Sequence, residues 1–392
     1  MKWTTGLARH PQASQAFAEA VDRLDLDTEG RADVLVIFFT HTHRDEVDAL
    51  ARAAAERFPE AVCIGCSAAG VVADEEQAEQ ECAVSLSLGV APGVDVAPVR
   101  LEPDIHDRED FDWQQHSPLG EMSEPHMLVL SDVRTFDSEQ LLRALDERHP
   151  DGERFGALVG GSRDDDLLLL EGHVFEDGGV GLALSGDLEV DTYVAQPARP
   201  IGEPLIVTSH TEHVVHRFDQ GNPMEVFRRT VRQLGPEDQK LAKHSMLVGI
   251  GLGTQNREFG HGDFLLRNIA GFNPKNGDLA VAATIEDLDV LQFHLMSPQT
   301  AIDELEKSLE ECRRAHPESN GEQGALYFSC RERGEEFYGE QNLEPNLIQD
   351  HLEGLSVGGC LSDGDIGALG EHTHLHGYAS TLTVIGPGGD SD

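Results

Sequence analysis

The feature that most constrains the fold of this chain is a strand–helix–strand–strand unit that occurs three times. Each copy begins with an apolar strand, at residues 34–40, 126–132 and 325–330. An amphipathic helix, a second apolar strand and a further strand follow in each copy. The first three elements have the order and length of a parallel β-α-β crossover, which is nearly always right-handed. We therefore expect an α/β protein with mixed sheets flanked by helices, in two domains built from related β-α-β-β units.

Small residues at the end of each middle strand predict a turn. The three turns are Gly65-Cys66-Ser67, Gly160-Gly161-Ser162 and Gly359-Cys360. Polar residues also follow the first strands, namely Thr40, His41, Asp132, Ser329 and Cys330. Glycine lets a backbone approach a ligand closely, and ligands gather at the carboxyl ends of parallel strands. These positions therefore predict a ligand pocket, unless the small residues only allow tight packing of the strand ends.

A proline-rich break predicts where the chain divides. Residues 196–204 read QPARPIGEP and carry no apolar periodicity. We therefore expect one domain over residues 1–200 and a second over residues 201–392, each long enough to bury its own core.

The charge of the chain is strongly negative. It has 72 Asp and Glu against 29 Lys and Arg, a formal net charge of −43. The acids are spread between apolar segments, which favours a solvated acidic surface over a disordered tail. Such a surface repels itself unless salt screens it, so we hypothesise a halophilic host and expect the melting temperature to rise from low to molar KCl. The same charge argues against nucleic-acid binding, which needs clustered Lys and Arg.

Targeting signals and a disulfide framework are not apparent. The N-terminal sequence MKWTTGLARHPQ lacks the apolar core of a signal peptide, and no apolar run approaches membrane-spanning length. Six cysteines are scattered along the chain. We expect a cytoplasmic protein that does not associate with membranes.

Five short motifs, in order along the chain, resemble the FIST family with its N-terminal and C-terminal regions in tandem. They are Gly65-Cys66-Ser67-Ala68-Ala69-Gly70, Gly160-Gly161-Ser162-Arg163-Asp164-Asp165, Phe264-Leu265-Leu266-Arg267-Asn268-Ile269, Phe328-Ser329-Cys330-Arg331-Glu332-Arg333-Gly334, and Gly359-Cys360 with Gly364-Asp365-Ile366-Gly367. The family usually has Gly-Glu-Ile where this chain has Gly364-Asp365-Ile366. The resemblance implies a non-catalytic sensory protein of bacterial or archaeal signal transduction that binds small ligands such as amino acids. A signalling protein partner would fit that role.

Charged residues near these motifs suggest how an amino acid would be held. A guanidinium can bind a carboxylate with two hydrogen bonds while a carboxylate accepts the ligand's ammonium group. Arg267 is the candidate anion anchor, unless it is a buried structural ion-pair partner. The candidate acids are Asp164, Asp165, Asp363 and Asp365, unless they are solvated surface. The motifs add Gly70, Arg333 and Gly364 to the predicted ligand-binding residues.

The sequence is also compatible with two other functions. Cys66, Cys330 or Cys360 would be the nucleophile of an enzyme of acyl-transfer or redox chemistry, although small buried cysteines are commoner. A protein-protein scaffold without a small ligand is the third reading. We expect no catalytic residue.

Two histidine tracts are candidate metal sites. His372, His374 and His376 alternate and would share one face of a strand, whereas His210, His213 and His216 have a spacing that suits a helix. Neither tract has the flanking carboxylates of a known metalloenzyme motif. We expect neither a metal nor a cofactor.

Overall fold

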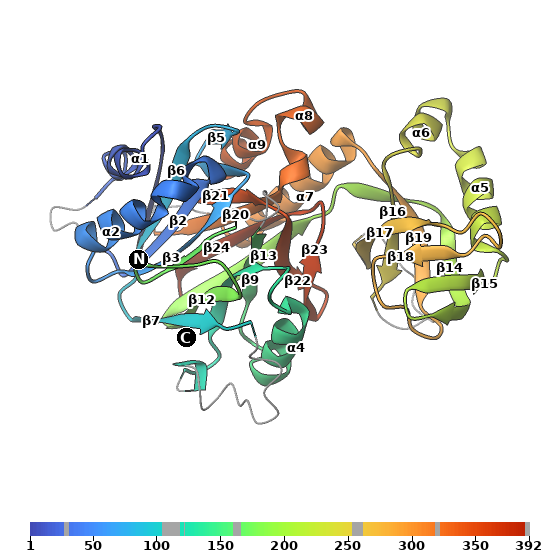
Figure 1. Cartoon of the computed structure of the whole chain (residues 1–392), viewed down its shortest axis with the longest axis horizontal. Coiled ribbons are helices and arrows are strands. Elements are labelled where there is room, and N and C mark those ends of the chain that lie inside the picture. The colour runs from blue at the N-terminus through green and yellow to red at the C-terminus, as the bar shows by residue number, and fades with distance from the viewer. Residues whose placement is uncertain are drawn as a thin grey trace. The chain divides into compact units, whose positions relative to one another are not determined.

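The structure is a computed structural model that describes residues 1–26, 31–103, 118–120, 122–159, 166–252, 262–317 and 322–388. Contacts divide the chain into two compact units (Figure 1). The first combines Met1–Val194 with Glu306–Asp392, and the second is Ala195–Leu305. One cut therefore lies close to the expected boundary at residue 200. The C-terminal segment, however, packs with the first unit and does not continue the second.

Three mixed sheets make up the first unit. Sheet 1 runs in the order β1 (Lys2–Arg9), β6 (Ala83–Val90), β2 (Val34–Thr40), β3 (Val62–Ala68), β10 (Leu168–Leu170) and β11 (His173–Phe175). Sheet 2 runs β23 (His372–His376), β22 (Gly364–Leu369), β9 (Arg154–Val159), β8 (His126–Asp132), β12 (Gly179–Gly186) and β7 (Val94–Leu101). Sheet 3 runs β13 (Leu188–Ala195), β24 (Ser380–Pro387), β20 (Gly324–Cys330), β21 (Ser356–Ser362), β4 (Gly70–Ala73) and β5 (Glu76–Glu79).

The repeated unit of the sequence forms the centre of each sheet. In every copy the first and middle strands pair in parallel, and the last strand pairs antiparallel with the first. The three sets are β6-β2-β3, β12-β8-β9 and β24-β20-β21. The crossovers carry α2 (Val47–Arg57), α4 (Ser138–Arg148) and α9 (Leu343–His351). The predicted α/β class with mixed sheets is confirmed for this unit.

Each copy also gives strands to a neighbouring sheet. The strand that follows each middle strand leaves its own sheet and pairs with another copy's middle strand: β4 joins β21, β10 joins β3 and β22 joins β9. The strand that follows β6 along the chain, β7, pairs with β12 in sheet 2. The strands that follow the middle strands are thus exchanged in one direction around the three sheets, whereas β7 and β13, which follow the last strands of the first two copies, are exchanged in the other. No sheet is complete without strands from another copy.

Both faces of sheet 1 are buried, which explains the continuous apolar runs of its strands. On β2, Val36 and Phe38 point into a core that also contains residues of sheets 2 and 3. The intervening Ile37 and Phe39 belong to a second core with α1 (Ala13–Val21) and α2, which lie against this face (Figure 1). In the shared core the rings of Phe38 and Phe328 meet edge to face, with centroids 5.8 Å apart.

The glycines at the middle strands are not in turns, so that prediction was wrong. Gly65 and Gly359 lie inside β3 and β21, opposite Ile37 and Tyr327 of the neighbouring strands. A Cβ at Gly65 would lie 2.1 Å from the Ile37 carbonyl oxygen, and one at Gly359 would lie 1.8 Å from that of Tyr327. Only glycine fits, because a side chain would collide with the adjacent backbone.

In the second copy, the glycine that corresponds to Gly65 and Gly359 is Gly156, which precedes the predicted Gly160-Gly161. Gly156 lies opposite Val129, three residues before the end of β9, as Gly65 and Gly359 lie three residues before the ends of their strands. A Cβ there would lie 2.0 Å from the Val129 carbonyl oxygen. The tripled glycine is therefore a packing feature of the parallel strand pair. The predicted turn at residues 160–162 lies outside the described residues.

The second unit contains a closed barrel, and its described residues also form helices α5 (Pro223–Gln233) and α6 (Pro236–Leu241) and the start of α7 (Pro298–Ala315). Its strands follow the order β14 (Ala198–Thr211), β15 (Val214–Phe218), β18 (Leu279–Val281), β17 (Phe264–Phe272), β16 (Met246–Gly251) and β19 (Val290–Met296). Helices α5 and α6 each have proline in the first turn, as the sequence suggests for α5. Phe218, Leu279 and Phe293 are among the fully buried residues of its core.

The remaining helices connect these elements. They are η1 (His41–Glu46), η3 (Pro118–Gly120), α7 (Pro298–Ala315), η4 (Arg331–Arg333) and α8 (Glu335–Tyr338). Among the described residues, no helix has the length and apolarity needed to span a bilayer.

Candidate ligand-binding site

A cavity of about 990 Å³ opens at the carboxyl ends of parallel strands in the first unit. Thr40 and His41 line it at the end of β2, and Arg331 lines it immediately after β20. Leu361 of β21 and Ala69, between β3 and β4, complete this side. The cavity therefore lies where the sequence predicted a pocket, although its walls come from residues next to the predicted glycines.

The walls of this cavity carry many more carboxylates than cations. Its acidic residues are Glu79, Glu81, Glu332, Glu335 and Glu336. Arg331 is the arginine among the residues that line it, and its Nη1 donates to Asp363 Oδ1 at 3.3 Å. Asp363 thus orients the guanidinium without closing it off, because the Arg331 side chain remains 40% exposed.

Two of the carboxylates are fixed by neighbouring groups. Glu79 Oε1 accepts a hydrogen bond from the Glu335 backbone N–H at 2.9 Å, at the start of α8. Glu81 Oε2 accepts from Arg9 Nε at 2.8 Å. Both glutamates come from the hairpin and loop that follow the exchanged strand β4. The strand exchange therefore brings the first copy's carboxylates next to the third copy's Arg331.

Arg333 and Glu344 form an ion pair beneath the cavity. They are 1% and 2% exposed, and Arg333 Nη2 lies 2.6 Å from Glu344 Oε1. The same carboxylate accepts from Ser329 Oγ at 2.7 Å and from the Tyr338 hydroxyl at 2.7 Å. Burial alone would lower the pKa of Arg333, but the facing Glu344 carboxylate raises it, so the guanidinium stays charged. Arg333 is therefore committed to an internal network.

The predicted cysteines are all buried, and Cys66 and Cys360 belong to the core shared by the three sheets. The thiols of Cys66 and Cys360 contact each other, and both residues are 1% exposed. Burial, together with the nearby Asp365 carboxyl, raises the pKa of Cys330 to about 12. A thiol with such a pKa is protonated at neutral pH and is a poor nucleophile.

Asp365 lies in the same cluster and is completely buried. Its Oδ1 accepts from Ser362 Oγ at 2.8 Å. Burial raises its pKa well above the usual value, in spite of that hydrogen bond and of the nearby Arg333 charge. The structure thus brings Cys66, Cys330, Cys360 and Asp365 together, but as a packed interior and not as the wall of a cavity.

Arg267 belongs to the other compact unit. It lies on β17 of the barrel, opposite Val248, and its Nη1 donates to the carbonyl oxygen of the adjacent Leu266 at 3.0 Å. The cysteine and glycine positions all lie in the three-sheet unit. Neither unit by itself therefore combines Arg267 with them.

The other predicted ligand-binding residues either pack against neighbouring groups or lie outside the described residues. Ser67 is buried in β3, where its hydroxyl accepts from the Leu167 backbone N–H at 2.9 Å. A Cβ at Gly70 would lie 2.9 Å from the Ala78 carbonyl oxygen, and one at Gly364 would lie 2.9 Å from that of His376. The predictions at Gly160, Gly161, Ser162, Asp164 and Asp165 fall outside the described residues.

The two histidine tracts have different outcomes. His372, His374 and His376 do alternate along β23, as predicted. His210 and His216 lie on the antiparallel strands β14 and β15, so their placement on a helix was wrong. A tight turn between two strands gives the same spacing of three as a helical face. Among the described residues, no group of three or more metal-ligating side chains is found.

The sequence missed most of the charged residues at the cavity. Arg331 stands in the motif that contains Arg333, and its position directly after an apolar strand is a signal that favours it at the strand end. For Glu79 and Glu81 the sequence carries no such signal, because their position depends on β4 pairing with a strand almost 290 residues later.

Comparisons with known proteins find two family domains, whose boundary falls inside the barrel unit. Residues 34–221 match the FIST N domain and residues 223–368 match the FIST C domain. The chain is 28% identical to the Mycobacterium tuberculosis (strain ATCC 25618 / H37Rv) "Uncharacterized protein Rv0628c" over 404 residues, covering 98% of this chain and 100% of that protein. It is 26% identical to the Mycobacterium bovis (strain ATCC BAA-935 / AF2122/97) "Uncharacterized protein Mb0898c" over 394 residues, covering 98% and 99% respectively.

Proposed function

This chain belongs to the FIST family, with an N and a C domain in tandem, and from that premise we propose that it binds a small polar metabolite as an intracellular sensory protein. FIST domains are regarded as sensory domains of signal transduction. The preferred ligand is an amino acid or a similar zwitterion, and the preferred site is the cavity at the ends of β2 and β20.

One observation carries this proposal: a partly exposed arginine and several glutamates line the same cavity. Arg331 would bind the ligand's carboxylate through charge-assisted hydrogen bonds, and Glu332, Glu335 or Glu336 would accept those of its ammonium group. The cavity volume of about 990 Å³ lies near the upper end of the range for small-molecule sites. A simple anion would meet the surrounding carboxylates and be repelled.

The burial of the cysteines favours binding over catalysis. A cysteine nucleophile needs a lowered pKa and an accessible thiol, whereas burial raises the pKa of both Cys330 and Cys360. This supports a sensor more than a cysteine-dependent enzyme.

The test is a melting experiment with a panel of amino acids, simple carboxylates and alkylamines. A ligand present at a hundred times its dissociation constant adds about 2.7 kcal/mol to the stability of the folded state. We expect zwitterions to raise the melting temperature and the one-charge analogues to do so less.

Two matched variants make the test specific. Arg331→Gln should weaken binding of the best ligand about 10- to 100-fold, the usual range for a hydrogen bond to a charged group. Arg52→Gln, which removes an exposed arginine of α2 that does not line the cavity, should leave binding unchanged. Equal effects of the two variants would reject the site. A panel without any hit would favour a scaffold without a small ligand.

A further inference from the structure

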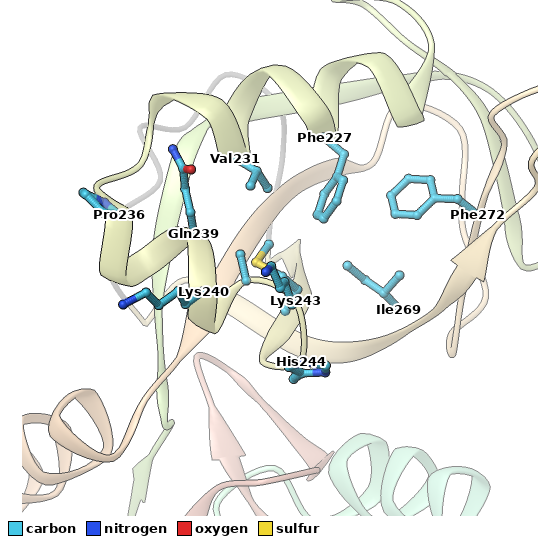
Figure 2. A pocket seen from close by; sticks show the side chains of 11 residues that line it. Phe227, Val231, Pro236, Gln239, Lys240, Lys243, His244, Ile269 and Phe272 are labelled. Atoms are coloured by element: carbon cyan, nitrogen blue, oxygen red, sulfur yellow. The ribbon is translucent and has the colours of Figure 1, made fainter.

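A second, chemically different cavity lies in the barrel unit. It has a volume of about 760 Å³ and lies between α5, α6 and the strands β16 and β17 (Figure 2). Phe227 and Val231 reach it from α5, and Ile269 and Phe272 reach it from β17. All four side chains are only partly buried. The rings of Phe227 and Phe272 have centroids 4.9 Å apart, so together they present one continuous apolar wall.

The rim of this cavity is basic, in contrast to the chain as a whole. The protein has a net charge of −43, and its five lysines are Lys2, Lys240, Lys243, Lys275 and Lys307. Two of them, Lys240 and Lys243, line this cavity together with His244. Among the described residues that line this cavity there is no carboxylate, in contrast to the strand-end cavity of the first unit. The charge at this site is therefore suited to an anion.

Contacts on α6 show which of the two lysines is available. Lys240 Nζ pairs with Glu237 Oε1 at 2.8 Å, within one turn of the helix. The neighbouring Asp238 pairs with Arg199 at 2.6 Å. Both acids of α6 are thus neutralised by other cations. Lys243 makes no ion pair with any residue that the structure describes, and it is exposed at the edge of the apolar wall.

From this arrangement we propose that the barrel cavity binds an amphipathic monocarboxylate, with its apolar chain or ring against Phe227, Ile269 and Phe272 and its carboxylate at Lys243. Apolar surface that is removed from water supplies most of the affinity, and the lysine selects the charged end. The cavity volume lies within the usual range for small-molecule sites. This site differs from the zwitterion site in location and in ligand chemistry, and it does not depend on that proposal.

The experiment is isothermal titration of the full chain with hexanoate, octanoate and decanoate. Each additional buried methylene contributes about 0.8 kcal/mol, which predicts an affinity about fourfold higher per methylene. Decylamine, with the same chain and the opposite charge, should bind at least tenfold more weakly than decanoate. Molar KCl should reduce this preference for the carboxylate while leaving the dependence on chain length intact, because salt screens only the charge.

Variants locate the site. Lys243→Gln should raise the dissociation constant of decanoate about three- to fivefold, as expected for a solvent-exposed ion pair. Lys275→Gln, which removes an exposed lysine of the same unit outside the cavity, should have no effect. Val231→Asp should abolish decanoate binding, and a far-UV circular dichroism spectrum would establish that it still folds. Arg331→Gln should bind decanoate normally, which separates this site from the zwitterion site.

Three results would overturn the proposal. The first is an absence of saturable decanoate binding to the unchanged chain. The second is equal binding of decylamine and decanoate, which would indicate unselective adsorption to apolar surface. The third is a stable dimer in sedimentation that Val231→Asp converts to monomer, since the wall would then be an interface between two copies of the chain.

Discussion

The Arg333–Glu344 pair allows a quantitative test of what holds the three-sheet unit together. Glu344 accepts hydrogen bonds from Arg333, Ser329 and Tyr338, at 2.6–2.8 Å. Glu344→Gln keeps the shape of the side chain but leaves the guanidinium buried without a counter-charge. Breaking a buried ion pair in this way costs about 3–5 kcal/mol. At about 4 kcal/mol, the ratio of folded to unfolded molecules falls nearly a thousandfold.

Urea unfolding followed by tryptophan fluorescence is a suitable assay. Trp3 is buried in the core that the three sheets share, so its emission reports on that unit. A matched control is Glu310→Gln on α7, which removes an exposed partner of Arg314 at 3.1 Å. An exposed pair of this kind contributes only about 0.3–0.5 kcal/mol.

A double substitution tests the physical reason. Arg333→Met with Glu344→Leu removes both charges and fills a similar volume, so it should recover most of the stability that Glu344→Gln loses. The reasoning would be refuted if Glu344→Gln cost less than about 1 kcal/mol, or if the double variant were no more stable than the single one. The first result would mean that water reaches the pair, and the second that the hydroxyls of Ser329 and Tyr338, left without their acceptor, cost as much as the unpaired charge.

Three further predictions concern the buried cluster and the strand glycines. In the native protein below about pH 9, Cys330 should resist alkylation by iodoacetamide, because burial raises its pKa to about 12. The half-buried Cys82 should react first, whereas rapid labelling of Cys330 would favour the enzyme interpretation. Asp365→Asn should raise the melting temperature at pH 7, and this gain should vanish near pH 4. Burial raises the folded-state pKa of the Asp365 carboxyl, so the unchanged protein loses stability as pH rises above the unfolded-state pKa. A gain independent of pH would contradict this. Gly359→Ala should lower the free energy of unfolding in urea by more than about 3 kcal/mol, because its Cβ would lie 1.8 Å from a backbone oxygen. A Cβ at Gly377 would have nothing within 4 Å, so Gly377→Ala should lower it little, and equal losses would refute the steric argument.

The local elements were predictable because the three copies of the unit carry the same apolar pattern. Val34–Thr40 forms β2, for example, because seven successive residues are buried, and that burial appears in the sequence as an uninterrupted apolar run. The parallel pairing of β2 with β3 followed from the helix between them. Such information is local, so a single sequence contains it.

The strand exchange and the site were harder to predict, because both depend on residues far apart in the sequence. The pairing of β4 with β21 joins Val71 to Cys360, and no local pattern specifies so distant a partner. Two carboxylates of the cavity, those of Glu79 and Glu81, depend on this pairing. Gly65 and Gly359 were correctly recognised as a recurring feature but misread as turns, because glycine marks a close backbone approach as readily as it marks a bend.

The order of the strands along the chain has a consequence for synthesis on the ribosome. The third copy of the unit emerges only after the whole barrel, because Ala195–Leu305 separates it from the first two copies. Until β21 is made, the hairpin of β4 and β5 has no further strand of sheet 3 to pair with, and sheet 2 lacks β22. The barrel, whose strands are contiguous in sequence, can close first, as domains generally fold in units during translation. The unit that contains the N-terminus is thus the last to be completed, and nascent chains with 305 residues exposed should show a protease-resistant barrel beside a protease-sensitive N-terminal half.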